Sequence, residues 1–362
     1  MPGPLHGLTI VEMAGIGPAP FAAMMLADHG AEVIRVEREG LIGIPNDPLL
    51  RSRRSIALDL KQDSAREVVQ ALAARADGLI EGYRPGVMER LGLGPDALLG
   101  GNPKLVYGRV TGWGQEGPLA DVAGHDVNYL ALSGLLHGIG PKERPVVPGN
   151  YLADFAGGGM MLAFAMVSAL LDVQRGGEGQ VIDCAMSDGA ALIGALTYGM
   201  HSAGLWTDER ESNLLDGGSA TYGVHECSDG KFLALGAIEP QFRAALIQGL
   251  GLGADATREE VARIVATRSR DDWVARLVGL DACVAPVLTL EEAPQHPHNR
   301  ARGTFIDLDG VVQPGPAPRY ARSGAAEPVP PKAPGADGEA ILAGLGYGPG
   351  DIKRLRGEGA LL

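Results

Sequence analysis

The first third of the chain alternates short apolar runs with helix-like patterns. Residues 8–12 and 32–37 are apolar runs that predict buried strands, and residues 21–29 between them have the spacing of a helix. This order predicts a βαβ unit with a right-handed crossover. Further predicted strands, each followed by a glycine-rich turn or a helical pattern, are residues 78–81, 105–110 and 180–184. Together they predict an α/β fold with an open, mostly parallel sheet.

The pattern changes near Asp216. Residues 221–227 and 232–237 alternate like strands and are separated by a short hairpin turn. Helices are predicted from Pro240 and near residues 271–280. This combination predicts a second, smaller α+β domain.

The same patterns set the predicted domain boundaries. Residues 313–336 are rich in proline and nearly free of helix pattern, so they predict an extended connection. Two short helices are predicted after it, at residues 338–345 and 349–356. The predicted segments are a large domain at 1–200, a small α+β domain at 216–310, and a return at 311–362 that packs with the large domain.

One apolar stretch resembles a membrane span in composition. Residues 155–171 carry no charge, but the stretch is short for spanning and includes three glycines near its start. Asp154 and Asp172 bound it on either side. We therefore predict a helix buried between the layers of a soluble protein, with no membrane partner.

Charge and cysteine content narrow the possible partners. The 362 residues carry a formal net charge of −13 without any basic run, which argues against a nucleic-acid partner. Cys184, Cys227 and Cys283 lie far apart, a spacing that fits neither a disulfide framework nor a zinc site. No targeting segment is evident, and the final Gly-Ala-Leu-Leu is not a peroxisomal S-K-L signal. We expect a cytoplasmic protein without a bound metal.

Two candidate proton-transfer groups lie beside glycines at predicted helix starts. His125 follows Gly124 and opens one predicted helix, and Asp154 opens the next. Helix starts expose unpaired N–H groups, which favour negative charge nearby. Two such groups in one pocket would be equipped to move a proton off carbon and return it. The alternative is that Asp154 is only an N-cap and that His125 is an ordinary surface or core histidine.

The first glycine-rich turn does not match a dinucleotide-binding fingerprint. Gly15 and Gly17 match the start of G-x-G-x-x-G, but Pro20 occupies the third position. Pro18 also lacks an N–H that could face a phosphate. A nicotinamide-dependent dehydrogenase is therefore a remote alternative.

Basic residues gather around the second predicted strand. Arg35 and Arg38 close that strand, and residues 51–61 carry four cations against the single anion Asp59. The four cations are Arg51, Arg53, Arg54 and Lys61. Arginine forks suit phosphate oxygens. The cluster predicts either a pyrophosphate-bearing, phosphorylated ribose ligand or a solvated face.

A series of motifs along nearly the whole chain resembles one family. The motifs are residues 11–15, 58–61, 82–87, 111–115, 124–129, 150–159, 177–183, 186, 215–218, 236–242 and 281–288. In their order and number they are similar to the alpha-methylacyl-CoA racemases of the family III CoA-transferase superfamily. Ser219-Ala220 departs from the family's usual alanine-proline, and His225 stands at a position where other members vary. These departures affect substrate preference more than reaction class.

The resemblance implies an architecture and a site. It implies a Rossmann-like large domain, a small α+β domain and an interlocked homodimer, with each active site between the large domain of one chain and the small domain of the other. His125 and Asp154 match the family's catalytic pair, and Glu239 and Asn150 match its supporting polar residues. On residues alone, Glu239 fits either a pocket acid or a first-turn charge. The implied CoA contacts are Arg38, Leu58, Asp59, Leu60, Lys61, Gly124, His125, Asp126, Val127, Asn128 and Tyr129, with Tyr83, Arg84 and Ile16 as additions.

The resemblance also implies an activity. The thioester carbonyl acidifies the α-C–H, so a base on one face and an acid on the other interconvert the (R)- and (S)-2-methylacyl-CoA through an enolate. No metal or redox cofactor is required. The alternative is a CoA transferase in which Asp154 is a nucleophile. The acyl tail is expected on a pliable surface that includes Met160, Met161, Met186 and Met200.

Overall fold

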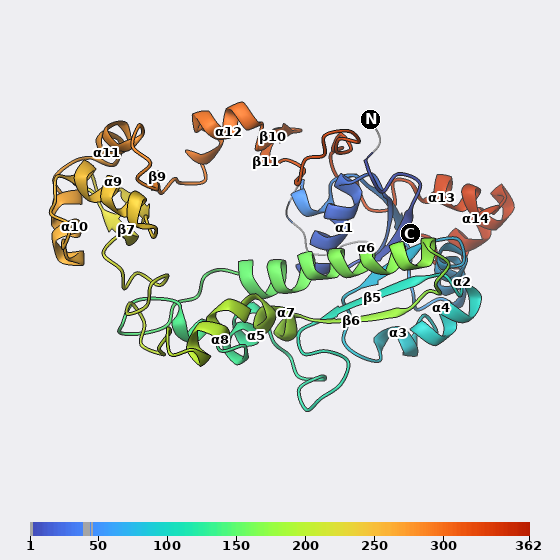
Figure 1. Cartoon of the computed structure of the whole chain (residues 1–362). Helices are drawn as coiled ribbons and strands as arrows, with labels where there is room; N and C mark the ends of the chain where they lie inside the picture. Colours follow the sequence, from blue (N-terminus) through green and yellow to red (C-terminus); the bar gives the residue numbers. More distant parts are fainter. Residues whose placement is uncertain (1–2, 39–43, 45) are drawn as a thin grey trace. The chain divides into compact units, whose positions relative to one another are not determined.

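The computed structural model describes residues 3–38, 44 and 46–362, and the chain divides into two compact units (Figure 1). The first unit consists of residues 1–133, 149–193 and 303–362, and the second consists of residues 134–148 and 194–302. The second unit therefore also holds residues 134–148 and 194–215, which the predicted small domain leaves out.

The first unit is built on a six-stranded parallel sheet with the order β3-β2-β1-β4-β5-β6. Its strands are β1 (Thr9–Met13), β2 (Glu32–Glu37), β3 (Arg53–Ala57), β4 (Gly78–Glu81), β5 (Val106–Thr111) and β6 (Val181–Ala185). The predicted mixed α/β fold with a parallel sheet is confirmed. The strand order reverses between β1 and β4, which is where ligands of such sheets bind, beyond the carboxyl ends of the strands.

The sequence analysis missed β3. This strand begins with two arginines and has a serine at its centre, so its sequence lacks the apolar run expected of a buried parallel strand. A buried ion pair between Arg53 and Glu12 of β1 takes the place of that run.

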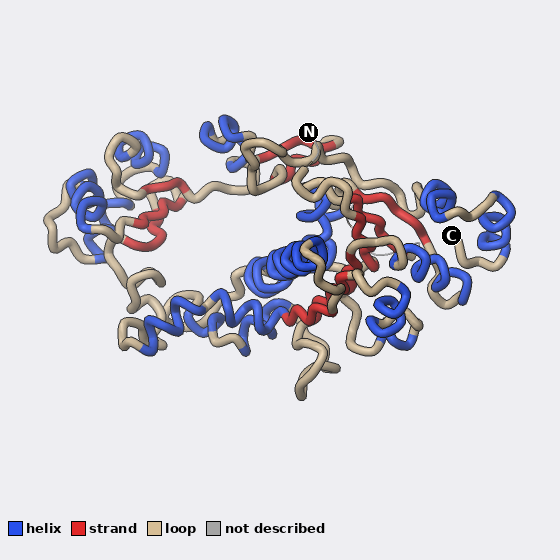
Figure 2. Tube along the Cα trace, turned by 45° about the vertical axis from the view of Figure 1, so that its right-hand side comes forward, coloured by secondary structure: helices blue, strands red, loops and turns tan. Residues whose placement is uncertain are grey.

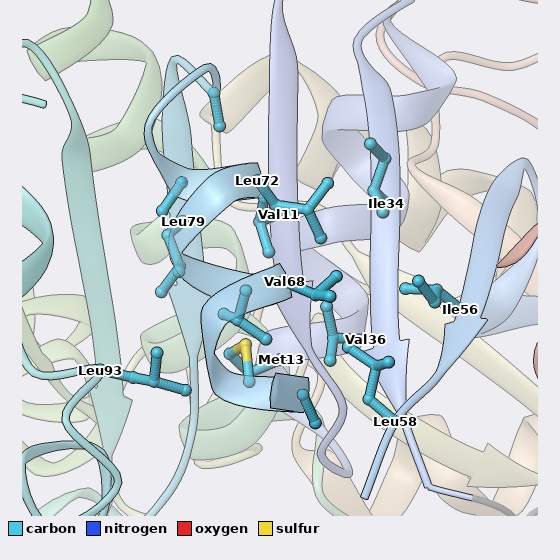
Figure 3. Packing of buried hydrophobic residues seen from close by; sticks show 14 of the residues in the cluster. Val11, Met13, Ile34, Val36, Ile56, Leu58, Val68, Leu72, Leu79 and Leu93 are labelled. Atoms are coloured by element: carbon cyan, nitrogen blue, oxygen red, sulfur yellow. The ribbon is translucent and has the colours of Figure 1, made fainter. Parts of the chain in front are cut away.

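One face of the sheet is covered by helices from both ends of the chain. Val68 and Leu72 of α2 (Asp63–Ala73) pack with Val11, Ile34 and other strand residues in one core (Figure 3). The predicted C-terminal helices are confirmed as α13 (Gly338–Leu345) and α14 (Pro349–Gly357), and both contribute to this core. The short helices α3 (Val87–Arg90) and α4 (Pro95–Gly101) connect β4 to β5.

The opposite face of the sheet carries α1 (Pro18–Asp28) and α6 (Met161–Gln174). A Cβ atom on Gly78 of β4 or on Gly108 of β5 would lie 2.7 Å or 2.6 Å from the thioether of Met166. Glycine at these two strand positions therefore lets α6 approach the sheet closely.

A ten-residue π-helix, η3 (Tyr151–Met160), leads directly into α6, so the two form one continuous helix (Figure 2). Glycines 157–159 of η3 are buried against α1 and α7 (Met186–Ile193). A Cβ on Gly189 of α7 would lie 1.9 Å from the carbonyl oxygen of Gly157. The backbones of η3 and α7 therefore touch, and π-helical turns of this kind are frequent at functional sites.

The helix Tyr151–Gln174 is long and apolar enough to cross a membrane, by length and composition only, and 44% of its most apolar window is buried. Leu162 and Met166 are buried, whereas Phe164 and Leu171 are 70% and 45% exposed. The prediction that this helix is buried between two layers is therefore wrong for a single chain, because one of its faces is open.

The rest of the first unit includes α5 (Asp126–Leu132) and a hairpin of β10 (Phe305–Leu308) and β11 (Val311–Pro314). The predicted extended return follows β11. A buried arginine, Arg51, donates to the Gln313 side chain and to the Pro314 carbonyl at 2.9 and 2.8 Å, which holds the start of the return against this unit.

The second unit contains an antiparallel sheet of β7 (Tyr222–Glu226), β8 (Phe232–Gly236) and β9 (Val284–Pro286). The predicted hairpin and helices are present, and β9 was missed. Three helices, α9 (Pro240–Leu250), α10 (Arg258–Val265) and α11 (Arg270–Leu277), share a core with this sheet around Trp273. The unit also holds α8 (Ala195–Ser202) and α12 (Pro297–Arg302).

The backbone contact between η3 and α7 predicts a sharp response to one methyl group. Gly189→Ala should destabilise the protein by about 3 kcal/mol, because overpacking against backbone cannot be relieved by a side-chain rotation. Gly100→Ala in α4, where a Cβ would meet nothing within 4 Å, is the matched control and should be neutral or slightly stabilising. Urea unfolding of both variants is the measurement, and equal stabilities would contradict the close approach.

Candidate active site

The candidate catalytic residues of the first unit gather beyond the carboxyl ends of β1 and β4. Gly17, the N-cap of α1 in the turn after β1, has a φ of +69°. A Cβ on Gly17 would lie 3.6 Å from Oδ2 of Asp154. The Asp154 carboxyl is therefore held against the first glycine-rich turn, at the point where the strand order reverses.

His125 is the N-cap residue of α5 and has extended backbone angles. Its backbone N–H donates to Oδ1 of Asn128 at 3.0 Å, and its side chain is exposed. The prediction that His125 opens a helix is confirmed. The exposed imidazole at the start of α5 is open to a ligand.

Asp154 is not an N-cap, so that alternative is wrong. It is the fourth residue of η3, and the N-cap is Asn150. The Asn150 amide donates to Oδ2 of Asp154 at 3.3 Å. Burial raises the pKa of the Asp154 carboxyl above its ordinary value, and the Asp126 charge adds to this, while the Asn150 hydrogen bond and the nearby His125 oppose it. A raised pKa favours a carboxyl that can donate a proton as well as accept one.

Asp126 links α5 to η3. Its side chain is only 5% exposed, and its Oδ2 accepts the backbone N–H groups of Ala153 and Asp154, both at 2.8 Å. The sequence analysis named Asp126 as a CoA contact and did not foresee this role. Its position beside His125 was a signal, because a carboxylate in a first helical turn is suited to N–H donors.

Tyr129 closes the same pocket from α5. Its ring lies edge-on to Trp113 with centroids 4.7 Å apart, and its hydroxyl donates to the Gly124 carbonyl. Burial and the Asp154 charge raise the pKa of the Tyr129 hydroxyl, and Arg84 acts in the opposite direction. Arg84 follows β4, so the loops after β1 and β4 and the start of α5 converge here.

The predicted cationic cluster is mostly an internal ion-pair network. Glu12 at the centre of the sheet is fully buried and accepts from Arg35 and from Arg53, the latter at 2.9 Å. Arg51 is buried and paired with Asp28. A solvated face is therefore wrong for Arg35, Arg51 and Arg53, which are buried. At the surface, Arg54 pairs with Glu32.

The implied CoA contacts divide into exposed and enclosed side chains. Those of Arg38, Lys61 and Arg84 are exposed. Those of Leu58, Asp126 and Tyr129 are buried, so a contact with CoA could come only from their backbone. The exposed cations lie at the carboxyl end of the sheet, after β2, β3 and β4 respectively.

The remaining implied contacts lie on the same loops. Tyr83 follows β4, is half-buried, and donates its backbone N–H to Glu81 at 2.7 Å. The Asp59 side chain accepts the Lys61 backbone N–H at 3.2 Å, and the Asp59 backbone N–H donates to the Ala360 carbonyl. These two hydrogen bonds hold the loop that includes Leu60. Val127 is partly exposed in the first turn of α5.

A cavity of about 450 Å³ extends from the first glycine-rich turn over β2 and β3. Ile16, which is 75% exposed, and Gly17 line one end of it. The other lining residues include Arg35, Glu37, Arg53, Ser55 and Pro331 to Pro334. Because Gly17 also contacts Asp154, the cavity begins beside the candidate site.

Three of the predicted site residues do not lie on the loops described above. Glu239 lies in the second unit as the N-cap of α9. Met186 is buried, and its Cγ would lie 2.8 Å from a Cβ on Gly158, so it packs the core instead of lining an open surface. Met200 lies in α8 of the second unit. Among the residues that the structure describes, no group of three or more His, Cys, Asp or Glu is placed to hold a metal ion.

Comparison with known proteins identifies relatives over most of the chain. The model of CoA-transferase family III matches residues 5–338. Alpha-methylacyl-CoA racemase of Mus musculus is 46% identical over 88% of this chain and 87% of its own length. The racemase of Homo sapiens is 45% identical over 87% of this chain and 86% of its own length. The crystal structure of a CAIB/BAIF family protein from Brucella suis superposes with a TM-score of 0.81 at 27% identity, covering 95% of this chain and all of that one.

The raised pKa of Asp154 predicts a stability effect that depends on pH. Because the folded-state pKa lies above the unfolded value, the Asp154 carboxylate destabilises the fold at neutral pH. Asp154→Asn should therefore be more stable than the wild type at pH 7. The gain should shrink as the pH falls through the folded-state pKa, since the folded-state carboxyl is then protonated while the unfolded one is still ionised, and it should be gone below the unfolded value, where the carboxyl is protonated in both states.

Urea unfolding at pH 7 and at pH 5 measures this effect. Asp77→Asn is the control, because Asp77 accepts the Thr9 N–H at 2.8 Å at the opposite end of the sheet and should gain nothing. A less stable Asp154→Asn variant at pH 7 would refute the raised pKa.

Proposed function

Because the chain belongs to CoA-transferase family III, and because its curated relatives at 45–46% identity are alpha-methylacyl-CoA racemases, we propose that it interconverts (R)- and (S)-2-methylacyl-CoA thioesters. The observation that carries the proposal is the Asp154 carboxyl with its raised pKa beside an exposed His125. These are two groups able to carry a proton, close to one another, as a two-base proton transfer requires.

The proposed mechanism moves one proton through an enolate. A neutral His125 removes the α-proton from the (S)-thioester, the electron pair moves onto the thioester oxygen, and a protonated Asp154 returns a proton to the opposite face. The (R)-thioester reacts in reverse, with Asp154 as the base. The first-turn N–H groups of α5 are suited to stabilise the enolate oxygen. Asn150, which donates to Asp154, keeps that carboxyl oriented.

CoA is proposed to bind along the carboxyl ends of β1 to β4. Arg38, Lys61 and Arg84 are exposed cations there, and they suit the phosphates of the nucleotide. The cavity that begins at Ile16 and Gly17 provides room beside the site. The strand order β3-β2-β1-β4-β5-β6 supports the description of this unit as Rossmann-like. The proton transfer needs no metal or redox cofactor.

A CoA transferase is the second candidate, and the family supports it. Asp154 would then be a nucleophile that forms an anhydride with the acyl group. A nucleophilic carboxylate is favoured by a low pKa, whereas burial and Asp126 raise the pKa of Asp154. This direction, and the presence of His125, favour the racemase.

We also propose that the protein is an interlocked homodimer in the cytoplasm. The open face of the η3–α6 helix is a stripe of Met160, Phe164, Val167 and Leu171, each between 38% and 70% exposed. Apolar residues at this helical spacing need a partner surface. A second copy of the chain, in place of lipid, would cover the stripe and bring Glu239 of its small domain to the site.

The reaction is tested by α-proton exchange in D₂O. The wild type should convert either pure thioester into the same final mixture of enantiomers and wash deuterium into both. His125→Ala and Asp154→Asn should each lose net racemisation by about 10²-fold or more, because general acid–base groups contribute about that much. Each variant should retain exchange of only the enantiomer that faces its surviving base.

The alternatives give different results in the same assay. Transfer of CoA to a free carboxylic acid, with the α-centre intact, would establish the transferase. Exchange of both enantiomers at the wild-type rate in both variants would exclude these residues as the two bases.

The dimer is tested by light scattering after size-exclusion chromatography. The wild type should have about twice the chain mass of 37.6 kDa, and Phe164→Glu should lower the apparent mass or the yield of folded protein, because it places a charge in the apolar stripe. A monomeric wild type that binds phospholipid vesicles would instead assign the stripe to a membrane.

A further inference from the structure

The carboxylate of Asp126 is buried without a cation. Its side chain is 5% exposed, and both of its hydrogen bonds go to one oxygen, Oδ2. The other oxygen, Oδ1, is buried with no hydrogen-bond partner in the part of the chain that the structure describes. Burying a carboxylate costs free energy when one of its oxygens accepts no hydrogen bond. This cost indicates a role for Asp126 beyond accepting the N–H groups at the start of η3.

The position of Asp126 supplies that reason. It follows His125 directly and joins the N-terminal turn of α5 to the N-terminal turn of η3. The two N–H groups that it accepts belong to Ala153 and to Asp154 itself, so the backbone that carries Asp154 is fixed relative to the backbone that carries His125. Asp126 thereby contributes directly to the separation of the two proposed bases.

We propose that Asp126 is a positioning residue for the proton transfer: its carboxylate holds the start of η3 against the start of α5 and so keeps Asp154 in place beside His125. This inference rests on the proposed racemase function. It assigns to Asp126 no contact with the substrate.

The charge of Asp126 acts on Asp154 with little competition. Asp126 raises the pKa of Asp154, and His125 opposes it through its charge. Of the helices packed against η3, α1 brings Asp28, which is paired with Arg51, and α7 brings Asp188, which is exposed. On β5, Arg109 is paired with Glu81 and Glu89.

Two substitutions separate the clamp from the charge. Asp126→Asn keeps an oxygen that accepts both N–H groups but removes the charge. With the (R)-thioester, for which Asp154 is the proposed base, the acid limb of the kcat/KM profile should then move to lower pH, with little change in KM. Asp126→Ala removes both features, and its kcat should fall about 100-fold, since a small misplacement of a catalytic group costs that much.

A second readout does not depend on turnover. In protein labelled with carbon-13 at the aspartate carboxyls, the signal that disappears in Asp154→Asn belongs to Asp154. Its titration should move to lower pH in Asp126→Asn. Asp77→Asn, which loses a carboxylate that also accepts a backbone N–H at 2.8 Å, should leave both the pH profile and this titration unchanged.

The outcomes are distinct. An unmoved Asp154 titration in Asp126→Asn, or a wild-type kcat in Asp126→Ala, would overturn the proposal. If Asp126→Ala does not fold, Asp126→Asn still decides, because it retains the hydrogen bonds. A wild type that exchanges no α-proton would refute the proposed function, while the titration would still test the effect of Asp126 on Asp154.

Discussion

The contact between the glycines of η3 and the helices α1 and α7 is the constraint on which the candidate site depends. At Gly157 and Gly189 there is no space for a Cβ atom, because the backbones of η3 and α7 already touch. The first turn of η3 carries Asp154, so this packing sets how far Asp154 can lie from the turn after β1, where Gly17 meets its carboxyl. A rigid, closely packed support is what a proton-transfer group needs, because its geometry has to be held to within a fraction of an ångström.

The buried ion pairs that join β1, β2 and β3 also support the site. Glu12 lies at the centre of the sheet with two arginine partners, Arg35 and Arg53, and Arg51 reaches the return segment at Gln313. Such buried pairs are costly to desolvate, and breaking one leaves an unpaired charge inside the protein. They hold the strand ends and the return in one arrangement, which leaves the exposed cations Arg38 and Lys61 to face solvent.

The two proposed bases of the site have different environments. Burial and the Asp126 charge raise the pKa of Asp154, while His125 stays at the surface of the first unit. One side chain is thus desolvated and the other solvated, which is the usual way in which two titratable groups acquire different roles. Asp126 contributes through the backbone that it holds and the charge that it carries, and Asn150 contributes through one hydrogen bond to the Asp154 carboxyl.

The sequence by itself determined the parallel α/β sheet, the antiparallel hairpin, the C-terminal helices and the family, since these follow from local periodicity, turn chemistry and motif order. It also identified His125 and Asp154 as the candidate pair. It could not determine that Arg53 begins a buried strand, that Leu58 and Tyr129 face inward, or that Asp126 clamps Asp154. Each of these depends on partners distant in the chain: Glu12 for Arg53, Leu361 for Leu58 and the start of η3 for Asp126. The role of a charged side chain cannot be read from the sequence alone. Whether it binds a ligand or supports the fold depends on its burial and on its neighbours, and only the tertiary structure supplies both.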